Sequence, residues 1–235
     1  MKYIMNSFLQ MLSSIRKDMM LFAACLAPVL AGLVFRFGIP QAEKRLCDFM
    51  GKTVVLTPYY ELFDIALGIL APVMFCFVAA MVILEERDEK QVKYLIVTPL
   101  GKRGYLFSRF GIPFFISVLV TLILISIFKL TKLALWTMLF LSVFGAMLGM
   151  IVALMIVTLS SNKLEGMAVS KLATLTMIGF MVPYFIGDKV QYILAPLPSF
   201  WMGKVIYHGN PFFILPGIAT ALVWIGFLMK RFMNS

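Results

Sequence analysis

Charged side chains are scarce in this chain. Asp, Glu, Lys and Arg make up only 14% of its 235 residues, whereas hydrophobic residues make up 62%. A soluble domain carries about 25% charged residues, because its surface has to be solvated by water. The scarcity of charge therefore excludes a soluble globular protein and predicts an integral membrane protein.

Groups typical of catalysis and metal binding are equally scarce. The only histidine, His208, precedes a turn signal at residues 209–211, and the three cysteines have no CxxC spacing. The sequence contains no HExxH motif, no GxSxG motif and no phosphate loop of the form GxxxxGKS or GxxxxGKT. We therefore expect no enzyme active site, metal centre, disulfide framework or bound cofactor in this chain, and no ATP hydrolysis by means of such a loop.

The few charged residues lie at the ends of long segments that contain no charge. Six of these segments reach or approach the ~20 apolar residues that a helix needs to cross the hydrocarbon core of a bilayer. The strands of a membrane barrel would instead show alternating segments of ~10 residues, which are absent. The sequence predicts an all-α integral membrane protein with one transmembrane domain, residues 1–235. Its six expected spans are residues 19–37, 62–84, 106–128, 133–159, 167–187 and 211–229.

Two further segments are expected at the membrane surface. Residues 1–17 place Ile4, Phe8 and Met11 on one helical face, which predicts an interfacial helix. Residues 188–210 are expected to form a long outer loop with aromatic side chains suited to the headgroup region. This loop either lies on the interface or re-enters the outer leaflet, and the sequence leaves both arrangements open.

The basic residues predict the orientation in the bilayer. With the N-terminus inside, thirteen Lys and Arg residues lie on the inner side and eight on the outer side. Because cytoplasmic loops carry the excess of Lys and Arg, we expect a multi-pass plasma membrane protein with both termini in the cytoplasm. Nucleic acid is not an expected partner, since the basic residues are spread over several loops instead of one face.

Residues 84–109 form the only long and densely charged run in the chain, and they lie on the expected inner side between spans two and three. Residues 85–101 are expected to form an amphipathic cytoplasmic helix. Two acid–base pairs at helical spacing support it, Glu86 with Lys90 and Glu89 with Lys93. Thr98-Pro99 ends it, because the residue before a proline avoids helical geometry. Its apolar stripe, made of Val92, Leu95, Ile96 and Pro99, suits docking either to a groove in another protein or to the lipid surface.

Two smaller sets of residues are expected to act between helices. Arg36 ends the first span, and Glu61 and Asp64 begin the second, so a charge pairing across these outer helix ends is expected. Gly145 and Gly149 form a GxxxG pair in the fourth span. Such a pair lets another helix approach closely, either within one chain or between two copies.

Two local motifs resemble the exporter-type (type-2) ABC transporter permeases. One is EERDEKQVKYLIVTPLGKRGY at residues 85–105, an acidic cluster followed by an apolar helix and a Thr-Pro-Leu ending; the other is SNKLEGMAVSK at residues 161–171. The six-span layout resembles that family too. Many relatives have Gly-Thr after the acidic cluster, where this chain has EERDEK.

The resemblance implies a transmembrane subunit of an ATP-driven exporter. A separate ABC ATPase would bind the ATP and Mg, and a second permease copy, identical or different, would complete the pathway. The resemblance implies that residues 85–101 couple the chain to that ATPase. Charge pairs with the ATPase would come from Glu85, Glu86, Arg87 and Lys90. The apolar residues Val92, Leu95 and Ile96 would fill its groove, and Thr98 and Pro99 would set the angle to the third span.

Two other classes of function remain open. An ion-coupled secondary transporter needs ionisable groups near the middle of its spans, and the expected spans have none there. A non-transporting membrane protein that only binds a partner, such as an immunity protein, is the other alternative. For an exporter, spans rich in Phe, Leu, Ile and Met suggest an apolar or amphipathic substrate such as a drug, lipid or peptide.

Overall fold

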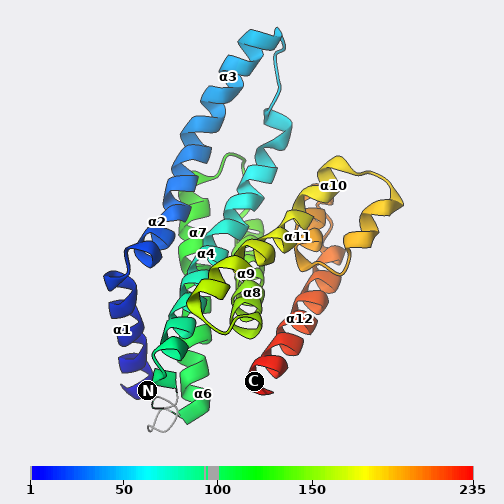
Figure 1. The fold of residues 1–235 in the computed structure, drawn as a ribbon. Helices are drawn as coiled ribbons and strands as arrows, with labels where there is room; N and C mark the ends of the chain where they lie inside the picture. Colours follow the sequence, from blue (N-terminus) through cyan, green and yellow to red (C-terminus); the bar gives the residue numbers. More distant parts are fainter. Residues whose placement is uncertain (1, 93, 95–100, 235) are drawn as a thin grey trace.

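The computed structural model describes residues 2–92, 94 and 101–234 (Figure 1). These residues form helices and no strand, which confirms the all-α prediction. The α-helices are α1 (Lys2–Lys17), α2 (Met19–Leu33), α3 (Ile39–Met50), α4 (Tyr60–Asp88), α6 (Gly101–Leu106), α7 (Ile112–Phe128), α8 (Leu135–Leu159), α9 (Lys163–Leu175), α10 (Val182–Phe185), α11 (Pro198–His208) and α12 (Ile214–Asn234). Two π-helical turns, Val34–Gly38 and Phe107–Gly111, join α2 to α3 and α6 to α7. Short 3-10 helices occur at Thr57–Tyr59, Thr176–Met181, Lys189–Leu194 and Pro211–Phe213.

Six helical segments of the described chain are long and apolar enough to cross a membrane, which confirms a six-span membrane protein. They are Met19–Met50, Thr57–Asp88, Gly104–Phe128, Leu135–Leu159, Lys163–Phe185 and Pro211–Met233.

The helices α4 and α8 form the centre of the bundle. Both are mostly buried, whereas the segments that contain α2 and α12 are mostly exposed at the outside. Neither central helix has a polar face, as expected of a helix surrounded by other helices. The helices α2 and α7 pack on α4, and α7 and α12 pack on α8, so most of the bundle contacts one of the two central helices.

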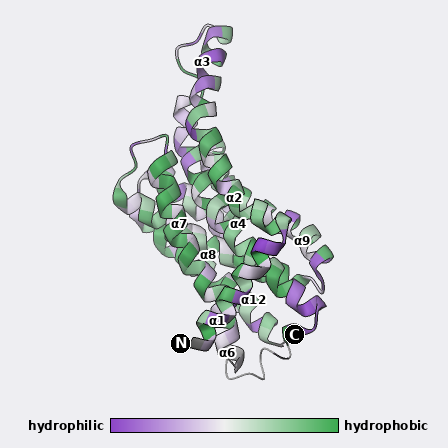
Figure 2. Ribbon diagram, turned by 90° about the vertical axis from the view of Figure 1, so that its left-hand side faces the viewer, coloured by the Kyte–Doolittle hydropathy of each residue, from purple (hydrophilic) through white to green (hydrophobic). Residues whose placement is uncertain are grey.

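The first membrane-crossing helix is longer than the predicted 19–37. Helical geometry continues to Met50 through the π-helical turn Val34–Gly38, and Pro40, which comes just after this turn, does not end the helix. The helix ends at Gly51, whose φ of +62° is the left-handed conformation that glycine adopts without a Cβ clash. As a result α3 and the start of α4 project beyond the rest of the bundle (Figure 1), and polar residues gather near their tip (Figure 2).

Residues 188–210, predicted to form an outer loop, contain a packed helix. The helix α11 lies against the 3-10 helix Thr176–Met181 and against α12. The close approach depends on Gly203, since a Cβ there would lie 2.1 Å from the carbonyl oxygen of Phe180. Burial extends to Lys204, which is only 2% exposed and has its Nζ 3.7 Å from the centre of the Tyr192 ring.

The two termini lie at the same end of the molecule, opposite the tip of α3 (Figure 1). The last turn of α4 lies at the end that holds the termini, and it carries the charged residues described next.

Candidate functional site

Three consecutive charged residues, Glu85, Glu86 and Arg87, occupy the last turn of α4. Successive residues of an α-helix point about 100° apart, since 3.6 residues complete a turn. The three side chains therefore leave α4 in different directions, and each contacts a different neighbouring element. We call the resulting set of contacts the α4 junction.

The Glu86 carboxylate forms a buried ion pair with Arg109 in the π-helical turn before α7. Both Glu86 oxygens accept from Nε of Arg109 at 3.1 Å, and the Tyr105 hydroxyl donates to the same carboxylate at 2.8 Å. Arg109 is fully buried, and its Nη1 also donates to the Ser7 carbonyl of α1 at 2.8 Å. This pair connects α4 to both α1 and the third span.

Lys163, the first residue of α9, connects α9 to α4 and to the residue between α1 and α2. Its Nζ donates to Glu85 of α4 at 2.7 Å and to Asp18, between α1 and α2, at 2.6 Å. Its backbone N–H donates to Asp88 at 3.0 Å. The Asp18 carboxylate also caps α2 by accepting from the N–H of Met20 at 2.8 Å. Hydrogen bonding from the Lys163 ammonium lowers the pKa of Asp18 below its ordinary value of 3.8, against the opposing effect of its burial.

Arg87 completes the junction on the remaining side of α4. Its Nη1 donates to the Val157 carbonyl at the end of α8 at 2.8 Å. The guanidinium carbon lies 5.2 Å from the centre of the Phe232 ring of α12, within range of a cation–π contact. The end of α4 is thus connected to α1, α8, α9, α12 and the start of the third span.

The two stretches that resemble ABC permeases meet in this junction. Glu85 comes from the first stretch and Lys163 from the second, and their ion pair joins them. The second stretch starts a helix in a regular way, because the side chain of Asn162 caps α9 by accepting from the N–H of Glu165 at 2.9 Å. Gly166 then lets α9 approach α4, since a Cβ there would lie 2.3 Å from Leu84 Cδ1.

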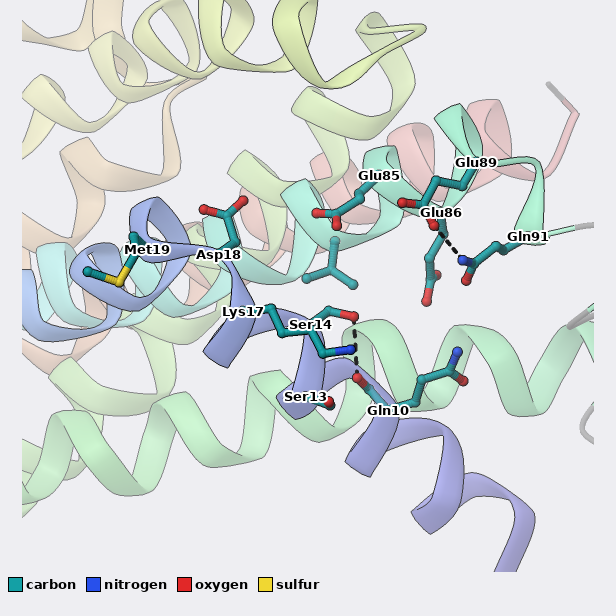
Figure 3. A pocket seen from close by; sticks show the side chains of 11 residues that line it. Gln10, Ser13, Ser14, Lys17, Asp18, Met19, Glu85, Glu86, Glu89 and Gln91 are labelled. Carbon is teal, nitrogen blue, oxygen red and sulfur yellow. Dashed lines mark hydrogen bonds between the residues drawn. The ribbon is translucent and has the colours of Figure 1, made fainter.

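A polar cavity of about 580 Å³ lies between α1 and the end of α4 (Figure 3). Its lining includes the acidic residues Asp18, Glu85, Glu86 and Glu89 and one cation, Lys17. Figure 3 shows the side chain of Glu89 beside Gln91, which donates a hydrogen bond to it. The cavity lies on the open face of the junction, and Glu89 and Gln91, which follow α4, form part of its lining.

The predicted helix 85–101 differs from the observed structure at its start. Residues 85–88 continue α4, and the chain turns at Lys90, whose φ of +59° is left-handed. Glu86 consequently pairs with Arg109 instead of Lys90. Of the apolar residues of the stripe, Val92 is half-buried. The predicted docking residues Leu95, Ile96, Thr98 and Pro99, like Lys93, lie outside the described residues.

The charges at the outer helix ends do not pair as predicted. Arg36 lies inside a continuous helix and donates from Nη1 to the Lys129 carbonyl at 2.7 Å. Asp64 accepts from the backbone N–H groups of Leu130 and Thr131 at 2.8 and 3.0 Å. Both residues thus fix the 129–131 linker between α7 and α8, and Glu61 forms no ion pair within the described chain.

Gly145 and Gly149 pack against α4 of the same chain. A Cβ at Gly145 would lie 2.1 Å from the carbonyl oxygen of Gly68, and a Cβ at Gly149 would lie 2.7 Å from that of Pro72. Of the two arrangements left open by the sequence, the structure shows packing within one chain at these positions.

Three residues of the junction were missed by sequence reasoning: Asp18, Arg109 and Lys163. In the sequence they lie at the ends of charge-free segments, and no pairing partner was predicted for any of them. Their partners lie at least 23 residues away along the chain, so no helical spacing could reveal them. The sequence signal that could have identified them is their position at the ends of spans, because a charge there has to be solvated by water or paired with another polar group.

A comparison with protein-family models gives one match. The model described as "Fluoroquinolones export permease protein Rv2686c-like" matches residues 11–229. No curated protein and no solved structure matches the chain.

Proposed function

The chain belongs to the Rv2686c-like family of fluoroquinolone export permeases, and on this premise we propose that it is the transmembrane subunit of an ATP-driven drug exporter. A separate ABC ATPase binds the ATP and Mg, and a second permease copy completes the pathway. The exported molecules are apolar or amphipathic drugs. The subunit lies in the plasma membrane with both termini in the cytoplasm.

The α4 junction is the observation that carries the mechanistic part of this proposal. A force applied to the residues that follow Asp88 reaches the end of α4, because the chain joins them to it directly. From there the Glu86–Arg109 pair transmits it to α1 and the third span, and Lys163 transmits it to α9. Packed helices respond to such a force as rigid bodies, so closure of the ATPase changes the relative positions of the spans.

The structure changes the role proposed for the acidic cluster. Glu85, Glu86 and Arg87 hold the junction together within the chain, and the ATPase is contacted by the residues that follow Asp88. Tyr94 is a good candidate for this contact, because its side chain is 76% exposed and it lies within the predicted coupling segment in the sequence. An exposed aromatic side chain of this kind is a typical anchor of a protein interface.

Tyr94→Asp tests the coupling. The exposed position makes a folding defect unexpected, and a buried carboxylate would oppose docking of the ATPase. We expect the variant to insert normally, to lose its co-purifying ATPase, and to lose ATP-driven uptake of norfloxacin into inside-out vesicles. The control is Phe49→Asp, an equally drastic change at a 90% exposed residue near the tip of α3. Normal ATPase binding by Tyr94→Asp would contradict the coupling role.

The same vesicles separate the other classes of function. Norfloxacin uptake that follows an imposed proton gradient without ATP would show a secondary transporter. Binding of a partner without uptake under either condition would show a non-transporting protein.

A further inference from the structure

Two adjoining cavities lie along α8, away from the α4 junction. One is lined by α8 and α12, and the other is lined by the start of α4, the α7–α8 linker, α8, α11 and the first residue of α12. The cavity nearer the α7–α8 linker has a volume of about 480 Å³, and the one that extends along α8 to Met147 has a volume of about 400 Å³. They share the lining residues Trp136, Phe140 and Ile214, so they form one continuous cleft. We call it the α8–α12 cleft. A cleft of this size is in the range of sites that bind drug-sized molecules.

The outer part of the cleft presents two opposite charges. Glu61 and Lys132 both line it, both are exposed, and neither forms an ion pair within the described chain. Asp64, one turn after Glu61, shows the contrast, because its carboxylate is occupied by the 129–131 linker. The Tyr184 hydroxyl interacts with the Glu61 carboxylate, but no cation of the described chain neutralises that carboxylate. Glu61 and Lys132 can therefore each pair with the opposite charge of a ligand that carries both a cation and an anion.

The part of the cleft that extends along α8 to Met147 is apolar and partly aromatic. Phe140 stacks on Phe144 with a centroid distance of 5.4 Å, and Trp136 is 73% exposed at the mouth. The remaining lining residues are Leu139, Val143, Met147 and Ile218, together with the shared Ile214. Aromatic faces of this kind favour a flat aromatic body by stacking, which a saturated acyl chain does not exploit.

We infer that the α8–α12 cleft binds the exported molecule, and that it selects aromatic zwitterions. The ammonium group of the ligand contacts Glu61, its carboxylate contacts Lys132, and its aromatic body lies between Trp136 and Phe140 and extends toward Val143. This inference rests on the proposed function and adds the place and the residues of substrate recognition.

The test measures binding of norfloxacin, an aromatic zwitterion, to the purified chain in phosphatidylcholine nanodiscs. Norfloxacin should quench tryptophan fluorescence, and Trp136→Phe should remove the quenched component. Glu61→Gln should weaken norfloxacin binding by about tenfold, the effect expected for the loss of one contact to a charged group. It should leave the binding of nalidixic acid, a quinolone carboxylate without a basic amine, unchanged. Lys132→Met should weaken the binding of both.

Matched controls lie in the projecting part of the chain formed by α3 and the start of α4. Asp48→Asn and Lys52→Met remove the same charges at exposed positions outside the cleft and should leave both affinities unchanged. Val143→Trp fills the apolar part without changing any charge and should also weaken norfloxacin binding. It keeps the inference testable if the charge variants fail to fold.

Three outcomes would overturn the inference. Wild-type affinity in both Glu61→Gln and Val143→Trp would show that the cleft is not the site. Displacement of norfloxacin by phosphatidylethanolamine, with Glu61→Gln affecting only that lipid, would show a lipid site. ATP-driven norfloxacin export with an unchanged KM in Glu61→Gln, Lys132→Met and Val143→Trp would refute the site while leaving the proposed function intact. If the wild-type complex exports no norfloxacin, the proposed function itself fails.

Discussion

Among single residues, the buried pair of Glu86 and Arg109 has the clearest energetic consequence. Glu86→Gln would leave the fully buried Arg109 cation without a counter-charge. Breaking a buried pair by removing one partner costs about 3 kcal/mol or more. We therefore expect a clear fall in the thermal unfolding temperature of the detergent-solubilised protein. The control, Glu89→Gln, changes an exposed carboxylate one turn away and should alter stability by less than about 0.5 kcal/mol.

The double variant separates the ion pair from mere packing. Glu86→Gln combined with Arg109→Met removes both buried charges, so it should be more stable than Glu86→Gln alone. Equal unfolding temperatures for the single and the double variant would show that the lone cation carries no penalty. The interpretation of the pair would then be wrong.

The lowered pKa of Asp18 predicts how the stability of the protein depends on pH. Its pKa is lowered in the folded protein by hydrogen bonding to Lys163, so it contributes stability above the unfolded value of 3.8. That contribution is lost as the pH falls through the lowered folded value, because the carboxyl group then takes up a proton. Asp18→Asn keeps a capping side chain for α2 but removes the charge. We expect it to lower the unfolding temperature at pH 7 and to make no difference at the lowest pH that the protein tolerates. A constant difference between the two proteins at every pH would contradict this origin.

The sequence alone identified some residues of the α4 junction but not their partners. The acidic cluster at Glu85–Arg87 was recognised from the sequence, because it is the densest charge in an apolar chain. Its partners were not, because Arg109 and Lys163 are brought to α4 only by the packing of the third and fifth spans. The predicted use of Glu86 followed the i,i+4 rule, but a buried guanidinium outcompetes an exposed lysine for the carboxylate.

For helices, the contact between α4 and α8 gives the sharpest prediction. Gly145→Ala would place a Cβ against the backbone of Gly68, which cannot move aside as a side chain can. Overpacking of this kind costs about 1–3 kcal/mol, so we expect a lower unfolding temperature. Gly226→Ala in the exposed part of α12 is the matched control, since nothing lies within 4 Å of its Cβ. It should be neutral or slightly stabilising, because alanine favours a helix over glycine. If both variants behaved alike, close packing at Gly145 would not be the reason for that glycine.

The spacing of charges predicted that the chain has six membrane-crossing helices. It often did not predict the residues at which a helix begins or ends. Hydropathy located the membrane-crossing segments because their length is dictated by the bilayer. It could not show that α3 continues past the first span, since the π-helical turn at Val34–Gly38 has no sequence signal. It also missed α11, a short segment with Pro198 at its first turn, whose helical geometry is stabilised by contacts of Gly203 with Phe180.

The arrangement of the whole molecule predicts which ends face which side of the membrane. Both termini and the α4 junction lie at one end, and the tip of α3 lies at the other (Figure 1). Because Lys and Arg favour the cytoplasmic side, we expect the end with the termini to face the cytoplasm. Labelling of Cys47, near the tip of α3, can show which side of the membrane that tip faces, because its thiol is free and partly exposed.

A membrane-impermeant maleimide applied to intact cells should therefore label Cys47 in a variant that also carries Cys25→Ala and Cys76→Ala. In a chain without the three native cysteines, Gln91→Cys should be labelled only after the membrane is permeabilised. Gln91 lies three residues after the end of α4 and lines the cavity of the junction, so it reports the face that the ATPase would have to reach. The opposite pattern, with position 91 labelled in intact cells, would place the α4 junction outside the cell. No ATPase driven by cytoplasmic ATP could then act on it, and the proposed coupling would have to be abandoned together with the orientation.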